Sequence, residues 1–299
     1  NGRSDHDPPA TTDHHAHVPT VGARSLNRRV RPGTALDRAD ERRDAALARV
    51  SHLEGAARAE EAARVLSRYC DMIAVRCFPN FQDWSVDRED RVIKQWARHA
   101  TVPVINMETI THPCQELAML MALQDRLGET DGKKFVLTWT YHPKPLNTAV
   151  ANSALIAAAK FGFDVTLLCP TPEYELDARY MNAARGYAAE NGRSVAVTHD
   201  IEAAYSGAHA VYAKSWGALP YFGRWDAEKP IRDAHRHFIV DAPKMALTDD
   251  ATFSHCLPMR RNVKVTDEVA DSPRSLIIDE AENRLHVQKA LMLELAQQE

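Results

Sequence analysis

The sequence predicts an α/β fold built on parallel sheets. Short β-type runs alternate with helical segments of about 10–16 residues, which is typical of right-handed βαβ units. Polar clusters follow several of these runs. Because ligands of such sheets bind beyond the carboxyl ends of the strands, we expect a site there. The length of 299 residues and the 44% hydrophobic content suit two domains with substantial cores.

The expected elements follow from local pattern. Runs rich in β-branched and aromatic residues predict strands at 72–75, 102–105, 134–139, 165–169, 194–198, 208–213, 238–241, 252–256 and 276–278. Helical periodicity predicts helices at 60–68, 88–100, 112–127, 148–161, 175–190 and 282–298. Gly128 and Gly162 directly follow two of these helices, as C-terminal glycines do.

The first 53 residues differ in composition from the remainder. Residues 1–68 contain no Phe, Trp, Tyr, Ile or Lys, and the first fifty carry nine arginines. Such a segment buries too little apolar surface to offset its ordering entropy, so we expect residues 1–53 to be disordered. Their Arg, Ala, Asp, His and Pro bias also resembles a GC-rich gene that is read out of frame or misjoined.

Two functions compete with disorder in this segment. Asp13–His17 contains three histidines that can bind a metal, and the arginine-rich stretch Arg24–Arg43 can bind polyanions. Solvated charge in a biased tail explains both stretches more simply.

Composition also restricts location and partners. The five cysteines, Cys70, Cys77, Cys114, Cys169 and Cys256, are odd in number and form no C-x-x-C, which favours reduced thiols in a cytoplasmic chain. Uninterrupted apolar runs, such as 154–159, are far shorter than the roughly 20 residues that span a bilayer. The net charge of −4 gives no reason to expect nucleic acid as a partner.

Five polar clusters follow the expected strands and converge if the sheet is parallel. They are Arg76, the group from Glu108 to Gln115, the group from Lys214 to Gly217, the group from His255 to Lys264, and the group from Asp279 to Arg284.

Four of these clusters also have a structural interpretation. His112 before Pro113 is typical of a helix start, Arg76 of a surface ion pair, and Lys214 of an exposed lysine on Trp216. His255 and Cys256 are also typical core residues. The sequence contains no G-x-G-x-x-G, P-loop or G-x-S-x-G motif, which weakens a nicotinamide oxidoreductase as an alternative.

Two tetrapeptides carry a resemblance to a known family. His112–Gln115 (HPCQ) and His255–Pro258 (HCLP) resemble the paired motifs of the aspartate/ornithine carbamoyltransferase superfamily. Further segments resemble its N-acetylornithine branch, with the N-succinylornithine enzymes close beside it. These are METITHPCQ (107–115), KFVLTWTYHPKPLNTAVANS (134–153), VYAKSWG (211–217) and DEAENRLH (279–286). The resemblance covers about residues 54–299.

This resemblance implies transfer of a carbamoyl group from carbamoyl phosphate to the δ-amine of an acylated ornithine, in arginine biosynthesis. It implies no cofactor, no metal and no covalent enzyme intermediate, so that catalysis consists of positioning and charge stabilisation. A cytoplasmic homotrimer is the assembly that it implies, with neither nucleic acid nor membrane as a partner.

The resemblance also implies roles for single residues. Arg76 and His112 polarise the carbonyl oxygen, Gln115 holds the amide, and Arg284 binds phosphate. The carbonyls of Cys256 and Leu257 accept from NH₂ groups, and Pro113 and Cys114 complete the carbamoyl phosphate site. Glu108 and Lys214, with Leu257 and Arg260, hold the amine substrate. Lys264 is a candidate for modification by carbon dioxide.

The sequence departs from the family pattern at one motif. It contains no Ser-x-Arg-Thr sequence, which in the family binds phosphate at the start of an early helix. We therefore expect residues 1–53 to be unmatched and residues 54–127 to be a truncated carbamoyl phosphate domain with an interdomain helix. Residues 128–284 form the acylornithine domain, and 285–299 a helix that returns to the first. A binding remnant without turnover stays an alternative.

Overall fold

The structure is a computed structural model that describes residues 46–49 and 56–297. Among these residues, no helix is long and apolar enough to cross a membrane. Two parallel sheets organise the described part of the chain, one of three strands and one of five.

The smaller sheet lies in the first part of the chain. It has the order β1-β2-β3, with β1 at Ala46–Arg49, β2 at Ile73–Arg76 and β3 at Val104–Glu108, and all neighbours are parallel. Helices α1 (Ala56–Leu66) and α3 (Arg91–His99) pack against each other, and Ile73, Val75 and Trp96 form a small buried core with them. A short helix, α2 (Trp84–Asp87), lies between β2 and α3.

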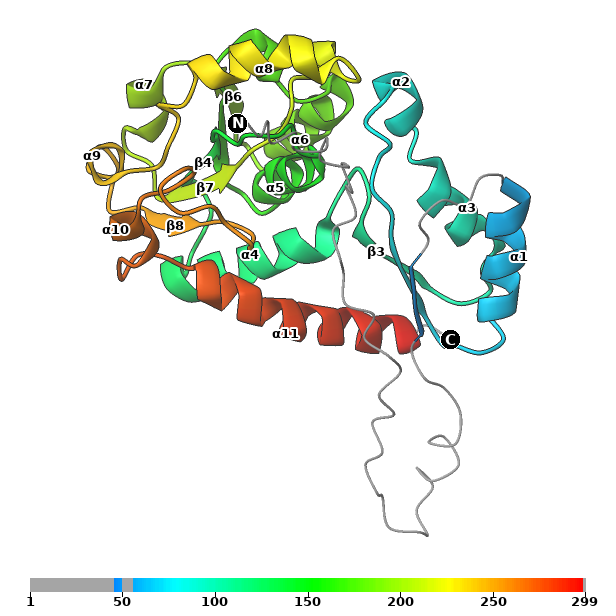
Figure 1. The fold of residues 1–299 in the computed structure, drawn as a ribbon. Coiled ribbons are helices and arrows are strands. Elements are labelled where there is room, and N and C mark those ends of the chain that lie inside the picture. The colour runs from blue at the N-terminus through cyan, green and yellow to red at the C-terminus, as the bar shows by residue number, and fades with distance from the viewer. Residues whose placement is uncertain (1–45, 50–55, 298–299) are drawn as a thin grey trace, which may run out of the picture. The chain divides into compact units, whose positions relative to one another are not determined.

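Two long helices pack side by side. Helix α4 (Pro113–Leu127) begins with proline in its first turn and ends at Gly128, whose φ of 66° suits glycine. Helix α11 (Ile277–Ala296) runs along α4, as Figure 1 shows. Their contact brings residues more than 160 positions apart in sequence into hydrogen-bonding distance.

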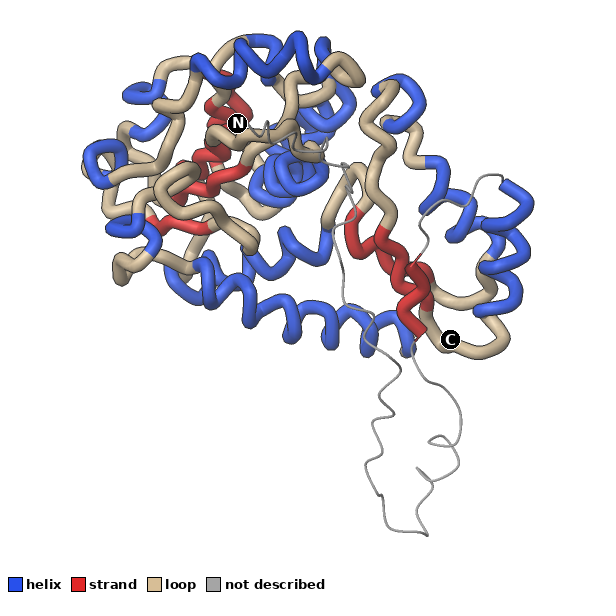
Figure 2. Tube along the Cα trace, viewed as in Figure 1, coloured by secondary structure: helices blue, strands red, loops and turns tan. Residues whose placement is uncertain are grey.

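The larger sheet has the order β6-β5-β4-β7-β8, again all parallel. The strands of the structure are drawn in red in Figure 2. Its strands are β4 (Lys134–Trp139), β5 (Asp164–Leu168), β6 (Val195–Thr198), β7 (Ala210–Lys214) and β8 (Thr252–Ser254). Strand β4 is almost wholly buried, which suits its mostly apolar sequence. The order places β7 beside β8, so Lys214 and the chain that follows Ser254 lie at neighbouring strand ends.

Helices join these strands. They are α5 (Ala149–Lys160), α6 (Ala178–Glu190), α7 (Ile201–Tyr205), α8 (Trp225–Ala234), α9 (Ala242–Met245) and α10 (Asp267–Ala270), with 3₁₀ turns η1 (Pro172–Tyr174) and η2 (Leu219–Tyr221). Helix α5 is alanine-rich and buried along most of its length, packing on β4, β5 and α6. Pro230 inside α8 explains why periodicity did not predict that helix.

Seven of the nine expected strands are confirmed to within three residues at either end, and two are wrong. Residues 238–241 belong to no strand of the larger sheet, and Val240 forms an isolated parallel bridge with Val265. In the segment 276–278, the Leu276 N–H donates to the carbonyl of Phe253, and helix α11 begins at the next residue, Ile277. The apolar run there is a helix start: Leu276 and Ile277 are buried, whereas Ile278 is 65% exposed.

Strand β1 lies within the segment 1–53 that composition predicts to be disordered. The backbone at 46–49 pairs in parallel with β2, from Ala46 opposite Ile73 to Arg49 opposite Arg76. Four residues without a β-branched or aromatic side chain are too few for a strand pattern to be recognised. The remainder of the segment, including Asp13–His17 and Arg24–Arg43, lies outside the described residues.

Candidate active site

Arg76 and Glu108 lie together at the ends of two neighbouring strands. The ladder between β2 and β3 shifts register after Val75, so that Arg76 lies opposite Glu108. The Arg76 guanidinium donates to Glu108 Oε2 at 2.7 Å. Glu108 has φ of 155°, a backbone conformation rare for a residue with a side chain and often associated with functional sites. The ion pair expected for Arg76 therefore exists, and its partner is itself a predicted site residue.

His112 lies one step further, at the start of α4. It occupies the N-cap position, with Pro113 in the first turn, so the helix-start interpretation is confirmed. Its backbone N–H donates to Ser153 Oγ at 2.7 Å, and its Nε2 lies 3.7 Å from Glu108 Oε2. Burial, with the nearby charges of Arg284 and Arg76, lowers the pKa of His112 to about 2. The imidazole is consequently neutral at physiological pH.

Lys214 ends β7 and points at the HCLP segment. Its Nζ donates to Cys256 Sγ at 3.3 Å. Burial alone lowers the pKa of Lys214, but attraction to Cys256 and Glu108 outweighs it and the pKa is raised. The interpretation of Lys214 as an exposed lysine on Trp216 is wrong. The Trp216 indole is 1% exposed and donates to the carbonyl of Tyr174 instead.

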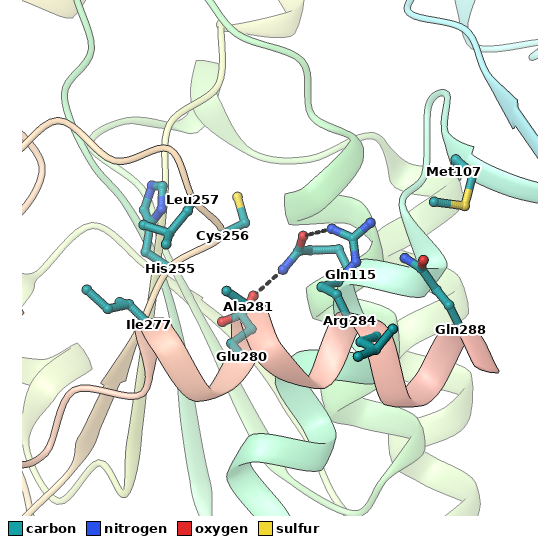
Figure 3. A pocket seen from close by; sticks show the side chains of 11 residues that line it. Met107, Gln115, His255, Cys256, Leu257, Ile277, Glu280, Ala281, Arg284 and Gln288 are labelled. Atoms are coloured by element: carbon teal, nitrogen blue, oxygen red, sulfur yellow. Dashed lines mark hydrogen bonds between the residues drawn. The ribbon is translucent and has the colours of Figure 1, made fainter. Parts of the chain in front are cut away.

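A cavity of about 330 Å³ lies between α4, α11 and the chain after β8. Figure 3 shows Gln115, Cys256, Leu257 and Arg284 around it. Gln115 accepts from the Arg284 guanidinium at 2.5 Å. Four of the six residues predicted to be catalytic therefore meet at one cavity, which Arg284 reaches from helix α11.

His255, Lys264 and Arg260 belong to the loop after β8. His255 and Lys264 are buried, and Lys264 Nζ lies 3.3 Å from His255 Nε2. Burial, together with the charge of Lys214, lowers the pKa of Lys264 to about 7. Arg260 is exposed, and its carbonyl accepts from the Lys264 N–H. His255 and Cys256 are buried, as the core interpretation requires, and Cys256 also lines the cavity.

Pro113 and Cys114, which were predicted to complete the carbamoyl phosphate site, lie away from the cavity lining. Pro113 is exposed, and Cys114 is buried with its thiol directed at the carbonyl of Asn106, 3.6 Å away. Neither side chain is among those that line the cavity in the described part of the chain.

Sequence reasoning missed a buried polar layer behind Gln115. Glu280 accepts from Gln115 Nε2 at 2.5 Å, from the Tyr212 hydroxyl at 3.1 Å and from the Ser254 hydroxyl. Burial raises the pKa of Glu280 to about 7. Glu116 is also buried. The sequence offers one signal for this layer, which is Glu116 at the start of the otherwise apolar helix sequence that follows HPCQ.

Three positive groups lie within electrostatic range of His112. Arg76, Lys214 and Arg284 all lower the pKa of its imidazole, and such a group of cations suits an anionic ligand. Within residues 46–49 and 56–297, no group of three or more His, Cys, Asp or Glu side chains has metal-binding geometry.

Two family models match the chain. The model described as aspartate/ornithine carbamoyltransferase, Asp/Orn binding domain, matches residues 132–295, and the carbamoyl-P binding domain of the same family matches residues 39–125. The second match begins before residue 54, where the resemblance was expected to start.

Curated relatives rank in a consistent order. The N-acetylornithine carbamoyltransferase of Xanthomonas axonopodis pv. citri is 67% identical over 240 residues, which is 80% of this chain and 70% of that protein. The N-succinylornithine carbamoyltransferase of Bacteroides fragilis is 39% identical over 226 residues, covering 75% and 65%. The ornithine carbamoyltransferase of Cereibacter sphaeroides is 38% identical over 235 residues, covering 78% and 68%.

Solved structures agree with this order. An acetylornithine transcarbamylase complexed with acetylcitrulline matches with a TM-score of 0.79 and 66% identity, covering 79% of this chain and 72% of that one. A mutant of N-acetyl-L-ornithine transcarbamylase complexed with carbamyl phosphate and N-succinyl-L-norvaline matches equally well. On these grounds and on the geometry above, the chain belongs to the aspartate/ornithine carbamoyltransferase family.

Proposed function

We propose that the chain transfers the carbamoyl group of carbamoyl phosphate to the δ-amine of N-acetyl-L-ornithine, giving N-acetyl-L-citrulline and phosphate in arginine biosynthesis. The observation that carries this proposal is Lys214, which lies beside Cys256 and in electrostatic range of Glu108. A cation there repels the α-ammonium of free ornithine, whereas an acylated α-nitrogen has no charge to repel. The 67% identity to an N-acetylornithine enzyme, against 39% for the N-succinylornithine enzyme, favours acetyl as the acyl group.

The chemistry needs polarisation of a carbonyl and stabilisation of a leaving phosphate. The neutral δ-amine attacks the carbonyl carbon, a C–N bond forms, and the C–O bond to phosphate then breaks, with the amine proton leaving to solvent or phosphate. Arg76 and neutral His112, which retains one ring N–H, are the donors to the developing oxyanion. Arg284 is the bidentate partner of phosphate, with Gln115 and the carbonyls of Cys256 and Leu257 on the carbamoyl NH₂.

Lys264 is the candidate for modification by carbon dioxide. The reaction needs a neutral amine, whose nitrogen bonds to carbon while a proton leaves to solvent. A pKa of about 7 leaves a large neutral fraction at physiological pH. We expect ¹³C-bicarbonate to give a carbamate resonance in the protein that is absent from Lys264→Met; a resonance that persists in this variant excludes the assignment.

One observation favours a second candidate function. The sequence has no Ser-x-Arg-Thr motif, and such a loop supplies charge-assisted hydrogen bonds to phosphate of about 1.5–3 kcal/mol each. Without a substitute, loss of several bonds removes many powers of ten in rate. The alternative is therefore a protein that binds an acylated amino acid without turnover.

We also propose that the protein assembles as a homotrimer and that it is located in the cytoplasm. Five free cysteines, four of them buried, support a reducing compartment.

One assay separates these functions. Purified protein is given carbamoyl phosphate with N-acetylornithine, N-succinylornithine or ornithine, and both phosphate and the ureido product are quantified. Turnover fastest with N-acetylornithine supports the proposal, and turnover fastest with ornithine contradicts it. Binding of N-acetylornithine with turnover far below that of an intact relative supports the alternative.

A further inference from the structure

Glu280 is a buried carboxyl group at the base of the cavity. It is 1% exposed and accepts from three donors that lie on three different elements. These donors are Gln115 Nε2 on α4 at 2.5 Å, the Tyr212 hydroxyl on β7 at 3.1 Å and the Ser254 hydroxyl on β8. A carboxylate accepts hydrogen bonds only, so this set of partners suits the ionised form of Glu280.

The Gln115 amide is held between two opposite charges. Its Nε2 donates to Glu280, and its Oε1 accepts from Arg284 at 2.5 Å, as the dashed lines in Figure 3 show. Rotating the amide by half a turn would direct its NH₂ at the guanidinium and its oxygen at the carboxylate. Both hydrogen bonds would then be lost, so ionised Glu280 and Arg284 together select one orientation.

Glu116 is a second buried carboxyl, one residue after Gln115. It is 1% exposed, and neither of its oxygens has a hydrogen-bond partner within residues 46–49 and 56–297. Burial and the charge of Glu280 raise the pKa of Glu116 well above its usual range. The other charged or titratable groups that act on this pair are Arg284 from α11, Tyr212 and Lys214 from β7, and Cys256 after β8.

Two buried carboxyl groups that repel each other rarely ionise together. Glu280 has three donors that stabilise a negative charge, and Glu116 has none in the described residues. The proton therefore belongs on Glu116.

We propose that Glu280 is a positioning residue that fixes the Gln115 amide with Oε1 toward Arg284, and that Glu116 stays protonated so that Glu280 can remain ionised. The oxygen of an amide has two lone pairs, and Arg284 uses one of them. The other is available in this orientation to accept from an NH₂ group in the cavity. This last step rests on the proposed function, because the NH₂ group is that of carbamoyl phosphate; the orientation itself does not.

The test observes the side-chain amide of Gln115 by NMR in ¹⁵N-glutamine-labelled protein, with Gln115→Leu used only for assignment. A short bond to a carboxylate shifts the amide proton downfield, and we expect this shift to titrate with a midpoint near pH 7. Glu280→Gln should abolish both the shift and the titration. A resonance that titrates unchanged in Glu280→Gln would overturn the proposal.

Glu116→Gln is the matched control, since it makes the same isosteric change at the neighbouring buried carboxyl. If Glu116 is protonated, this variant keeps the downfield resonance and the midpoint. A midpoint that falls by one unit or more means that Glu116 carried a charge, which contradicts the second half of the proposal.

Tyr212→Phe keeps the test informative if Glu280→Gln does not fold. Removing one donor from the ionised form should raise the midpoint by about one unit; an unchanged midpoint overturns the assignment to Glu280. None of these measurements needs turnover. Failure of the proposed function, seen as absent carbamoyl transfer, is therefore distinguishable from failure of this inference.

Discussion

Burial sets the ionisation of single side chains around the cavity, and Lys264 is a clear case. It is 3% exposed, next to His255, and its pKa is lowered to about 7. In the unfolded chain a lysine titrates near 10.4. Between these two values the folded protein binds fewer protons than the unfolded chain, so stability rises with pH in that window.

Lys264→Met removes this linkage. At about 1.36 kcal/mol per pKa unit, the unfolding free energy of the native protein relative to the variant should rise by on the order of 4 kcal/mol from pH 7 to pH 10.5. Urea denaturation in carbonate-free buffer measures it, with the exposed Lys289→Met as control. If the difference in unfolding free energy between the native protein and Lys264→Met does not change across this pH range, the pKa of Lys264 is not lowered by folding.

The residue types of the site were predictable because chemistry restricts them. HPCQ and HCLP predicted His112, Gln115, Cys256 and Leu257 as site residues, and the structure places the last three of them around one cavity. Glu280 was not given a role, because its importance depends on three partners from distant elements. No local pattern encodes such a contact.

At the scale of elements, the short segment around α2 connects the two sheet regions. The Trp84 indole donates to Asp177 Oδ2 at 2.7 Å, and Arg88 lies 3.2 Å from the other oxygen of the same carboxylate. Asp177 also caps α6 by accepting from the Arg179 N–H at 2.9 Å. Nearby, Phe81, Trp84 and Trp225 surround the ring of Phe222. One carboxylate thus serves a helix cap and a contact between distant segments.

Asp177→Ala and Asp177→Asn separate these two roles. The alanine variant loses the cap and the Trp84 hydrogen bond, so we expect it to lose roughly 2–4 kcal/mol of unfolding free energy. The cap uses Oδ1 of the carboxylate and the indole uses Oδ2, whereas asparagine has a single accepting oxygen. Asparagine caps a helix about as well as aspartate, so this variant should keep the cap, lose the indole hydrogen bond and lose only about 1–2 kcal/mol. Urea unfolding measures both variants; equal losses would mean that the cap does not contribute.

Elements were predictable where they are long and periodic. The helix at 112–127 and the strand at 134–139 agree with α4 and β4 because an apolar face or run identifies each one. The strand expected at 276–278 was wrong because three apolar residues are compatible with either state. Only the packing of Leu276 beside β8 and of Glu280 against Gln115 determines that a helix starts there.

At the scale of the whole molecule, the parallel order of the two sheets creates the site. Strand ends supply Arg76, Glu108 and Lys214, while α4 and α11 supply Gln115 and Arg284. Sequence could predict that strand ends converge, since parallel topology requires it. The helix predicted at 282–298 contains Arg284, but the sequence could not predict that this helix packs on α4, because that packing depends on the complete fold.

In the proposed function, Lys214 is the residue that discriminates acylated from free ornithine. At about 4 Å and an effective dielectric near 20, repulsion between Lys214 and an α-ammonium costs on the order of 4 kcal/mol. Replacing the lysine with aspartate exchanges this repulsion for attraction. Lys214→Met serves as the control, because it removes the charge without reversing it.

Calorimetric titration with N-acetylornithine and with ornithine tests this most directly, on the native chain and both variants, with circular dichroism to verify folding. We predict that the native chain binds N-acetylornithine more tightly, that Lys214→Met narrows the ratio of the two affinities, and that Lys214→Asp narrows it further or inverts it. A ratio unchanged in Lys214→Asp would contradict the charge argument and, with it, the substrate assignment.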